Sequence, residues 1–421
     1  MFKRFLLLPI LMIAYVLVSA QDHCRSADYQ AQMLQNNPEL AMKMAEIENF
    51  TQNYLSALQH KIDGINLPSN LPTVINIPVV VHVLYNTAQE NISDAQIFSQ
   101  IDILNKDFQR QNADTVNTPM VFQPVAANCG FQFTLAKVDT AGYAITGIVR
   151  KHTTVQQFGL KDQIKFSAQG GDDAWDRNSY LNIWVGNLSA GILGYTSVIC
   201  GPAANDGVVV QYTAFGMGGT ATAPFNKGRT TTHEVGHWLN LIHTWGDADC
   251  GDDHVADTPP QSAADYGCPS GTVISCNNAP YGNMYSNFMD FTNDACMNLF
   301  TNGQRCRMQS LFQPGGARYP LLSSTALTAT PLPSPVNKQT ENVNTVSVYP
   351  NPANDIVTLQ INEQILAGSS LEIYNQVGQK MMSTIISQPT FQLNVSTLSK
   401  GIYYIKINDG QNRTMSKLLK L

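Results

Sequence analysis

The sequence predicts an α+β fold, in which a mixed, twisted sheet covered by helices follows a short helical segment and precedes a small β-sandwich. Residues 77–84 form a continuous β-branched and apolar run, typical of a strand buried on both faces. Helical and strand-like patterns alternate from there up to about residue 243. Short alternating strands separated by turn residues then occupy residues 347–421, which indicates the β-sandwich.

The individual elements follow from local patterns. Residues 21–60 are polar, with apolar residues at loosely helical spacing, and predict helices that could bury little surface by themselves. Ser93 can cap a helix whose apolar stripe is Ile97, Ile101, Leu104 and Phe108. Residues 230–243 predict the next clear helix, before a Gly-, Asp- and Cys-rich irregular region. Further strands are expected at 131–138, 180–185 and 208–212.

The N-terminus has the features of an export signal. Lys3 and Arg4 precede an uncharged apolar run over residues 5–18, and small residues follow up to Ala20, which predicts a cleaved signal peptide over residues 1–20. A membrane anchor is the alternative, but the run is shorter than the ~20 residues that a span requires. No later segment is apolar enough to cross a bilayer, so we expect a soluble exported protein.

Composition narrows the possible partners. Hydrophobic residues make up 43% of the chain and charged residues only 13%, which favours a folded protein over a disordered one. The net charge is −6 and no basic block occurs, so nucleic acid is not expected as a partner.

The residues that carry chemistry lie at 233–243, His-Glu-Val-Gly-His-Trp-Leu-Asn-Leu-Ile-His. In a helix, His233 and His237 lie on one face and can bind the same metal ion. Zinc takes neutral imidazole nitrogens and, in catalytic sites, keeps one position for water. Glu234 can accept the proton when this water attacks a peptide carbonyl and can pass it to the leaving amine.

A third ligand, His243, follows six residues after His237. A continuous helix would place it on the wrong side, so the chain must turn sharply in between, at a residue with positive φ. Asn240 suits this turn, because Asn tolerates the left-handed region better than other non-glycine residues. The pattern predicts a zinc metalloendopeptidase with protein or peptide substrates. Two alternatives are an inactive adhesion protein on the same scaffold and a zinc hydrolase of non-peptide amides.

Residues 228–247, together with the strand at 77–83, resemble the pappalysin family of metzincin metalloproteases, particularly its bacterial, cytophagalysin branch. Residues 287–291, Asn-Phe-Met-Asp-Phe, are similar to the Met-turn of that family, which implies that Met289 lies beneath the zinc. The resemblance covers about residues 75–320. It implies a two-lobed metzincin catalytic domain, with the zinc at the bottom of the cleft between the lobes.

The sequence departs from this family at two positions. Asn240 replaces the Gly of the metzincin motif. Phe291 replaces a Tyr that usually follows the turn methionine by two residues, where its hydroxyl can help to stabilise the oxyanion. Since such donors contribute up to a few kcal/mol, the loss favours either another donor or slower catalysis.

Five aspartates lie within residues 247–257, and carboxylates on a flexible loop suit calcium. The resemblance implies calcium here too, with Asp253 and Asp257 as candidate ligands, and a solvated acidic loop is the alternative. Related enzymes often favour Arg on the primed side, and Asp294 is a candidate partner for it.

The cysteines divide into two groups. Cys250, Cys268, Cys276 and Cys296 allow three pairings, of which the resemblance implies Cys250–Cys276 and Cys268–Cys296. Cys24 stands alone, and because a thiolate is a strong zinc ligand, it fits a cysteine switch in a propeptide over residues 21–60. The alternative for Cys24 is a disulfide to Cys129, Cys200 or Cys306.

Residues 346–421 resemble the sorting domain of the Bacteroidetes type IX secretion system, through Val-Tyr-Pro-Asn-Pro-Ala at 348–353 and Lys-Leu-Leu-Lys-Leu at the end. The resemblance implies the secretion machinery as a partner and a secreted or cell-surface location. A substrate-binding β-sandwich is the alternative. A Pro-, Thr- and Ser-rich linker is expected at 323–345, which leaves residues 61–322 for the catalytic domain, and Lys61 is a candidate activation cleavage site.

Overall fold

The computed structural model describes residues 24–62, 74–332, 346–361, 370–375, 379–386, 388, 390–408 and 413–421. The signal peptide predicted at residues 1–20 lies outside these ranges. The chain divides into two compact units, Met1–Pro333 and Ser334–Leu421. Within the described ranges, every helix is too short or too polar to cross a membrane.

The first unit is built on a mixed sheet whose described strands follow the order β2-β1-β4-β6-β5, with β3 also pairing with β1. All its pairings are parallel except that of the edge strand β5 with β6. Strand β1 is central and buried along nearly its whole length, which explains its continuous apolar sequence. The strands are β1 (Ile75–Tyr85), β2 (Phe131–Leu135), β3 (Ile148–His152), β4 (Leu181–Gly186), β5 (Gly194–Thr196) and β6 (Val208–Gln211).

Helices α3 (Asp94–Phe108) and α4 (Arg229–Trp238) share one hydrophobic core with the sheet. Ser93 caps α3 as predicted, because its hydroxyl accepts a hydrogen bond from the amide of Gln96. A second cluster, around Trp184, Tyr195 and Val209, includes Tyr29 from the N-terminal helices. Short 3₁₀ helices fill the connections at Ala113–Asn117, Gln123–Val125, Gln163–Lys165, Ser167–Gln169, Ala203–Asn205, Tyr212–Ala214 and Tyr319–Ser323.

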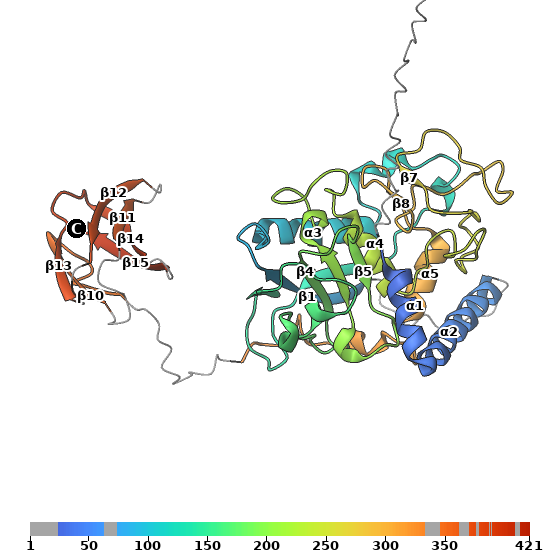
Figure 1. The fold of residues 1–421 in the computed structure, drawn as a ribbon, viewed down its shortest axis with the longest axis horizontal. Helices are drawn as coiled ribbons and strands as arrows, with labels where there is room; N and C mark the ends of the chain where they lie inside the picture. Colours follow the sequence, from blue (N-terminus) through green and yellow to red (C-terminus); the bar gives the residue numbers. More distant parts are fainter. Residues whose placement is uncertain are drawn as a thin grey trace, which may run out of the picture. The chain divides into compact units, whose positions relative to one another are not determined.

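The polar N-terminal segment forms the two predicted helices, α1 (Ser26–Asn36) and α2 (Pro38–Ile62), which pack on the rest of the first unit (Figure 1). The guanidinium of Arg307 forms a bidentate ion pair with Glu48 of α2, at 2.8 and 2.5 Å. Arg307 belongs to α5 (Asn302–Ser310), a helix that was not predicted. The sequence feature that indicates this helix is the capping box formed by Thr301 and Gln304.

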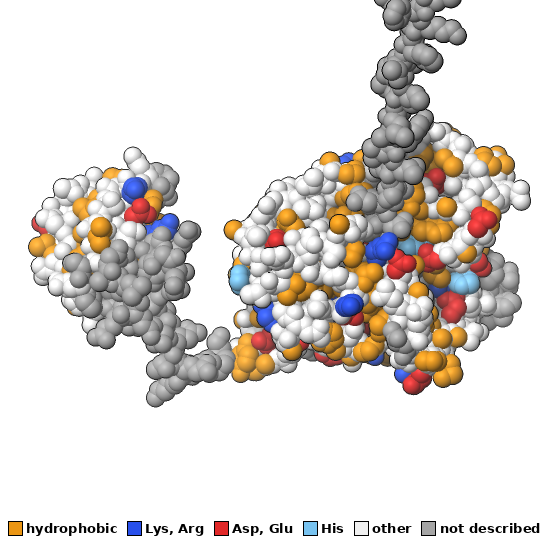
Figure 2. Space-filling view, in the orientation of Figure 1, with side chains coloured by type: hydrophobic (Ala, Val, Ile, Leu, Met, Phe, Trp, Pro, Cys, Tyr) orange, Lys and Arg blue, Asp and Glu red, His pale blue; other side chains and the backbone are white. Residues whose placement is uncertain are grey.

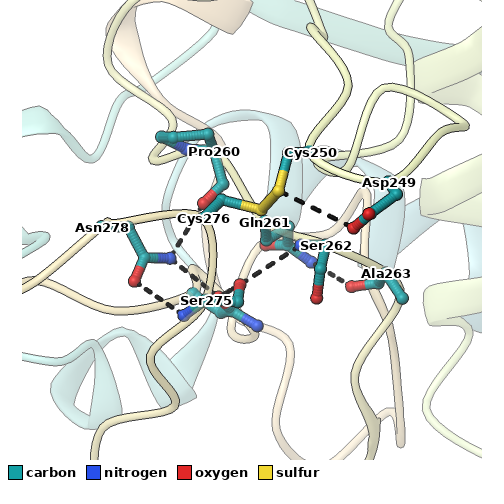
Figure 3. The surroundings of a disulfide bond; sticks show 10 residues. Asp249, Cys250, Pro260, Gln261, Ser262, Ala263, Ser275, Cys276 and Asn278 are labelled. Carbon is teal, nitrogen blue, oxygen red and sulfur yellow. Dashed lines mark hydrogen bonds between the residues drawn. A yellow bond between two sulfur atoms is a disulfide. The ribbon is translucent and has the colours of Figure 1, made fainter.

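The region between α4 and α5 is largely irregular, with only the short strands β7 (Tyr266–Gly267) and β8 (Phe291–Thr292). Disulfides join Cys250 to Cys276 and Cys268 to Cys296, the pairs that the resemblance implies. Around the first of these, the side-chain amide of Asn278 donates to the carbonyl of Pro260 at 2.9 Å (Figure 3). Cross-links and side-chain hydrogen bonds therefore replace regular structure in this loop.

The linker begins later than predicted. Residues 323–332, expected as its start, lie against the first unit: Ala326 is buried and its carbonyl accepts a hydrogen bond from the amide of Lys137 at 2.9 Å. The amide of Leu332 donates to the carbonyl of Gly142 at 2.9 Å. A Pro- and Thr-rich composition does not exclude such backbone pairing. The rest of the predicted linker lies outside the described residues.

The second unit is the predicted β-sandwich. Its described strands form two antiparallel sheets, ordered β13-β10-β9 and β12-β11-β14-β15. Alternate residues such as Val357, Leu371 and Ile405 form its core. The strands are β9 (Val346–Tyr349), β10 (Ile356–Ile361), β11 (Ser370–Asn375), β12 (Lys380–Ile385), β13 (Thr390–Asn394), β14 (Gly401–Asn408) and β15 (Arg413–Lys420).

Charged side chains cover only a small part of the faces shown in Figure 2. This agrees with the low charged fraction of the sequence, 13%.

Candidate active site

Helix α4 carries the His-Glu pair, and its N-terminus is held by two neighbouring segments. The carboxylate of Asp294 accepts hydrogen bonds from the amides of Lys227 and Arg229, at 2.7 and 3.2 Å. The guanidinium of Arg229 contacts Asp107 of α3 and lies 2.9 Å from a carboxylate oxygen of Asp114. Asp294 therefore caps α4, and its burial raises its pKa to about 6.

Helix α4 ends at Trp238, five residues before the end predicted from the sequence, His243. The sharp turn falls on Asn240, which has a φ of 69°, as the spacing of the histidines requires. The carbonyl of Asn240 accepts a hydrogen bond from Nε of Arg307 at 2.7 Å, which helps to fix this turn. Met289 lies under α4, because a Cβ on Gly236 would approach its sulfur to 2.5 Å.

The turn brings the three predicted histidines together. The Nε2 atoms of His233 and His237 are 3.0 Å apart, those of His237 and His243 are 3.0 Å apart, and those of His233 and His243 are 3.2 Å apart. Nδ1 of His233 donates to the carbonyl of Phe288 at 2.7 Å, and Nδ1 of His237 donates to that of Leu241 at 2.9 Å. A carbonyl can only accept, so these two rings carry their proton on Nδ1.

The third ring is oriented in the same way, because Nδ1 of His243 is hydrogen-bonded to the carboxylate of Asp247. Three Nε2 lone pairs therefore converge on one point, an arrangement that needs a cation between them. Burial, followed by the nearby His243, lowers the pKa of His237 to about 3, which keeps this ring neutral as a metal ligand must be. The three histidines fit a zinc ion.

Cys24 lies at the same point. Its sulfur is 3.5 Å from Nε2 of His237, and the ligand atoms of Cys24 and the three histidines all lie within 4.8 Å of one another. The following amide, of Arg25, donates to the carbonyl of Gly194 on β5 at 3.0 Å. Cys24, Cys129, Cys200 and Cys306 are all free thiols in the structure, so the alternative disulfide is not formed.

Glu234 is fully buried beside these groups. Its Oε2 accepts hydrogen bonds from the hydroxyls of Thr196 and Ser26, both at 2.8 Å. Burial raises the pKa of Glu234, and burial together with the charge of Glu234 raises the pKa of the Cys24 thiol. A Cβ on Gly194 would lie 2.8 Å from the Glu234 side chain, so this strand position must stay small.

Gly194, Thr196 and Ser26 all lie against Glu234, and the sequence alone does not predict their role. Strand β5 has only three residues and lacks a hydrophobic alternation long enough to recognise. No local signal could have identified these partners, because their role comes from their position beside α4.

The ring of Phe291, the position that departs from the family pattern, packs on two of the predicted metal ligands. Its centroid is 4.8 Å from that of His243 and 5.6 Å from that of His233. Phe291 and Asp294 line one small cavity with Glu234 and Cys24. The cavity therefore brings the predicted substrate-pocket residue next to the predicted base.

The two aspartates predicted to bind calcium have separate protein partners. The carboxylate of Asp253 accepts hydrogen bonds from the hydroxyl of Thr258 and the amide of Val255. The carboxylate of Asp257 accepts from the hydroxyl of Thr301 and the amide of Gly303, at the start of α5. Within the described residues, the groups of potential metal-ligating side chains do not include this pair.

Comparisons with known proteins agree with this geometry. The family model for pregnancy-associated plasma protein-A matches residues 166–313, and the model for a secretion system C-terminal sorting domain matches residues 347–420. An extracellular metalloprotease of Arthroderma otae is 33% identical over 264 residues, which are 59% of this chain and 82% of that protein.

Two solved structures of Tannerella forsythia proteins are similar to this chain. Mature mirolysin in complex with a cleaved peptide is 49% identical, covers 61% of this chain and 97% of its own, and gives a TM-score of 0.58. A promirolysin mutant is 43% identical, covers 72% of this chain and 97% of its own, and gives a TM-score of 0.65. The pro form thus matches a larger share of this chain than the mature form does.

Proposed function

We propose, since this chain belongs to the pregnancy-associated plasma protein-A family of metalloproteases, that its metal is zinc held by His233, His237 and His243, and that Glu234 is its general base. The protein is a secreted metalloendopeptidase made as a zymogen, and its C-terminal domain directs type IX export. The observation that supports the assignment best is the convergence of three Nε2 lone pairs beside a buried carboxylate.

The proposed chemistry divides between the metal and the chain. When bound, zinc polarises the peptide carbonyl and makes water a stronger nucleophile at neutral pH. Glu234 accepts the proton of the attacking water and then delivers it to the leaving amine. The hydroxyl of Thr196 donates a hydrogen bond to one carboxylate oxygen of Glu234 at 2.8 Å. This bond fixes the orientation of the carboxylate and therefore the direction of its second oxygen. In the precursor, the hydroxyl of Ser26 also donates a hydrogen bond to Glu234, and Cys24 would be the fourth ligand of a bound zinc, which would exclude water.

A casein or gelatin cleavage assay with the processed enzyme tests this proposal. We expect cleavage that a zinc chelator abolishes and that stoichiometric zinc restores, while calcium alone does not restore it. Cleavage of simple amides without cleavage of proteins would favour the non-peptide hydrolase. Failure to cleave any of these substrates by a folded, zinc-loaded enzyme would favour the inactive scaffold.

The Phe291→Tyr variant is expected to raise kcat about threefold to thirtyfold, roughly 0.7–2 kcal/mol, with a smaller change in KM. The new hydroxyl would be added in the cavity that also contains Glu234, where it could donate to the developing oxyanion. Steady-state kinetics on one peptide would measure the change. An unchanged or lower kcat in a folded, zinc-loaded variant would mean that the oxyanion is stabilised by other groups.

Calcium binding by the loop at residues 247–257 is a separate proposal. It is supported by the density of carboxylates in this loop. We expect calcium, but not magnesium, to raise the melting temperature of metal-stripped protein by several degrees. An Asp253→Asn variant should lose this effect, while Asp102→Asn, at an exposed position of α3 outside this loop, should keep it. Identical melting curves with and without calcium would argue for a solvated loop.

The boundaries of the zymogen and the role of Asp294 also remain proposals. We propose that the propeptide spans residues 21–60, that cleavage falls near Lys61, and that Asp294 faces an Arg side chain of the substrate. Asp294 is supported by its place in the cavity next to Glu234. Mass spectrometry of the processed N-terminus would locate the cleavage. Comparison of peptides with Arg or Leu after the scissile bond would test Asp294.

A further inference from the structure

Tyr29, on the N-terminal helix α1, is inserted into the body of the first unit. Only 2% of its surface is exposed, although it belongs to a polar segment with few buried side chains. It packs in the cluster of Trp184, Tyr195 and Val209. The helix that carries Tyr29 begins at Ser26, two residues after Cys24, so Tyr29 lies in the first turn after the thiol that contacts His237.

The walls of the Tyr29 pocket recognise an aromatic ring. The ring centroid of Tyr195 is 5.2 Å from that of Tyr29, with the planes tilted by 35°. The ammonium of Lys165, which is fully buried, lies 5.0 Å from each of these two centroids. An aromatic neighbour and a desolvated cation facing the ring are the two contacts that favour an aromatic side chain over an aliphatic one.

The floor of the pocket recognises a hydroxyl group. Tyr29 donates its phenol hydrogen to the carboxylate of Asp162. The same carboxylate is 2.9 Å from the ammonium of Lys165 and also accepts a hydrogen bond from the side chain of Asn205. A phenylalanine in this pocket would leave one acceptor position of Asp162 without its donor.

The pocket does not depend on α1 for its shape. Lys165 donates to the carbonyl of Asn205 at 2.9 Å and pairs with Asp162, and the hydroxyl of Tyr195 is 3.4 Å from Asp162. These contacts all lie within residues 162–205, outside the proposed propeptide. When the proposed propeptide leaves, Tyr195 and the charge pair remain, while Tyr29 is lost together with the apolar side chains that α1 and α2 pack on the same cluster.

The pocket is also within reach of a bound peptide. Tyr195 lies on the edge strand β5 between Gly194, which pairs with Arg25 of the precursor, and Thr196, which holds Glu234. An extended peptide that adds to this edge would place alternate side chains toward the two sides of the strand. One of them would point to the side where Tyr195 forms the pocket.

We propose that the pocket formed by Asp162, Lys165 and Tyr195, which Tyr29 fills in the precursor, is a substrate subsite of the processed enzyme that takes a tyrosine side chain. This inference rests on the proposed endopeptidase function. Tyr29 is then both an anchor of the propeptide and a mimic of the substrate. A purely structural role for Tyr29 would affect latency but would leave the substrate preference of the processed enzyme unchanged.

Cleavage of a peptide series by the processed enzyme tests the subsite. One Tyr, Phe or Ala is moved through the four positions on each side of a constant scissile bond, in peptides without other aromatic residues. We expect one position at which kcat/KM falls about tenfold from Tyr to Phe and further to Ala, with little effect at the others. The absence of any position that prefers Tyr would overturn the inference. If the peptides without aromatic residues and casein are also not cleaved, the proposed function fails instead.

A double variant tests whether the preference for Tyr over Phe depends on this pocket. Asp162→Asn with Lys165→Met replaces the buried ion pair by neutral groups of similar size without changing the net charge. The ratio of Tyr to Phe cleavage at the preferred position should fall close to one, while cleavage of the Ala peptides persists. The same substitutions in the exposed pair of α3, Asp102→Asn with Lys106→Met, should leave the ratio unchanged. A preference retained by the folded pocket variant would place the subsite elsewhere and overturn the assignment.

Discussion

Glu234→Gln is expected to abolish proteolysis, with a loss of at least about 10³-fold in kcat/KM, while zinc stays bound. Glutamine has the size of glutamate, and its oxygen can still accept the hydroxyl hydrogen bond of Thr196. It cannot take the proton of the attacking water. The three histidine ligands are oriented by Phe288, Leu241 and Asp247, so the substitution leaves the metal site intact.

Peptide kinetics and the zinc content of the purified variant would measure this result. Glu90→Gln offers a matched control, because Glu90 is also buried and accepts a backbone hydrogen bond from Asn86 at 2.6 Å, but lies outside the site. The control should keep nearly full activity. Substantial cleavage by a zinc-loaded Glu234→Gln enzyme would remove the role of general base from this residue.

Cys24→Ala is expected to give a precursor that cleaves a short peptide before any processing, at a rate at least about tenfold above the wild-type precursor. The thiol is the only side chain among the described residues that joins the three histidines as a fourth ligand. Without it, water can reach the fourth position. A short peptide is the suitable reporter, because Ser26 and α1 remain beside Glu234 and hinder larger substrates.

The matched control is Cys129→Ala, which removes another buried free thiol of the first unit and should leave the precursor latent. If Cys24→Ala stays as latent as the wild type, the helices themselves would block the cleft. The double variant Cys24→Ala with Glu48→Gln distinguishes this case, because it also breaks the ion pair of α2 with Arg307. Activity in the double variant alone would assign latency mainly to the docking of α2.

The comparisons confirm the family, the fold class and the type of activity that the sequence motifs indicated. These features are encoded locally. The spacing of His233, His237 and His243 requires a helix followed by a left-handed turn, and the structure places that turn at Asn240. The continuous apolar run of β1 follows from burial of both faces of the strand. The alternation of apolar and polar residues in the second unit follows from burial of one face.

Other features could not be predicted, because they depend on residues far apart in the chain. Thr196 lies on a three-residue strand without a recognisable pattern, and it contacts Glu234 only because β5 forms the edge of the sheet beside α4. Helix α4 ends at Trp238 and not at the predicted His243, because the apolar pattern of the sequence continues through the turn.

The proposed metal ligands, the proposed base and the export domain could each be recognised in the sequence, because each depends on residues close together in the chain. Their surroundings depend on contacts between residues far apart in the chain. In the sequence, nothing distinguishes Tyr29 from the other residues of a polar helix, and Asp162 and Lys165 have the pattern of exposed surface charges. Folding brings the three together in one buried pocket, where desolvation makes each contact specific.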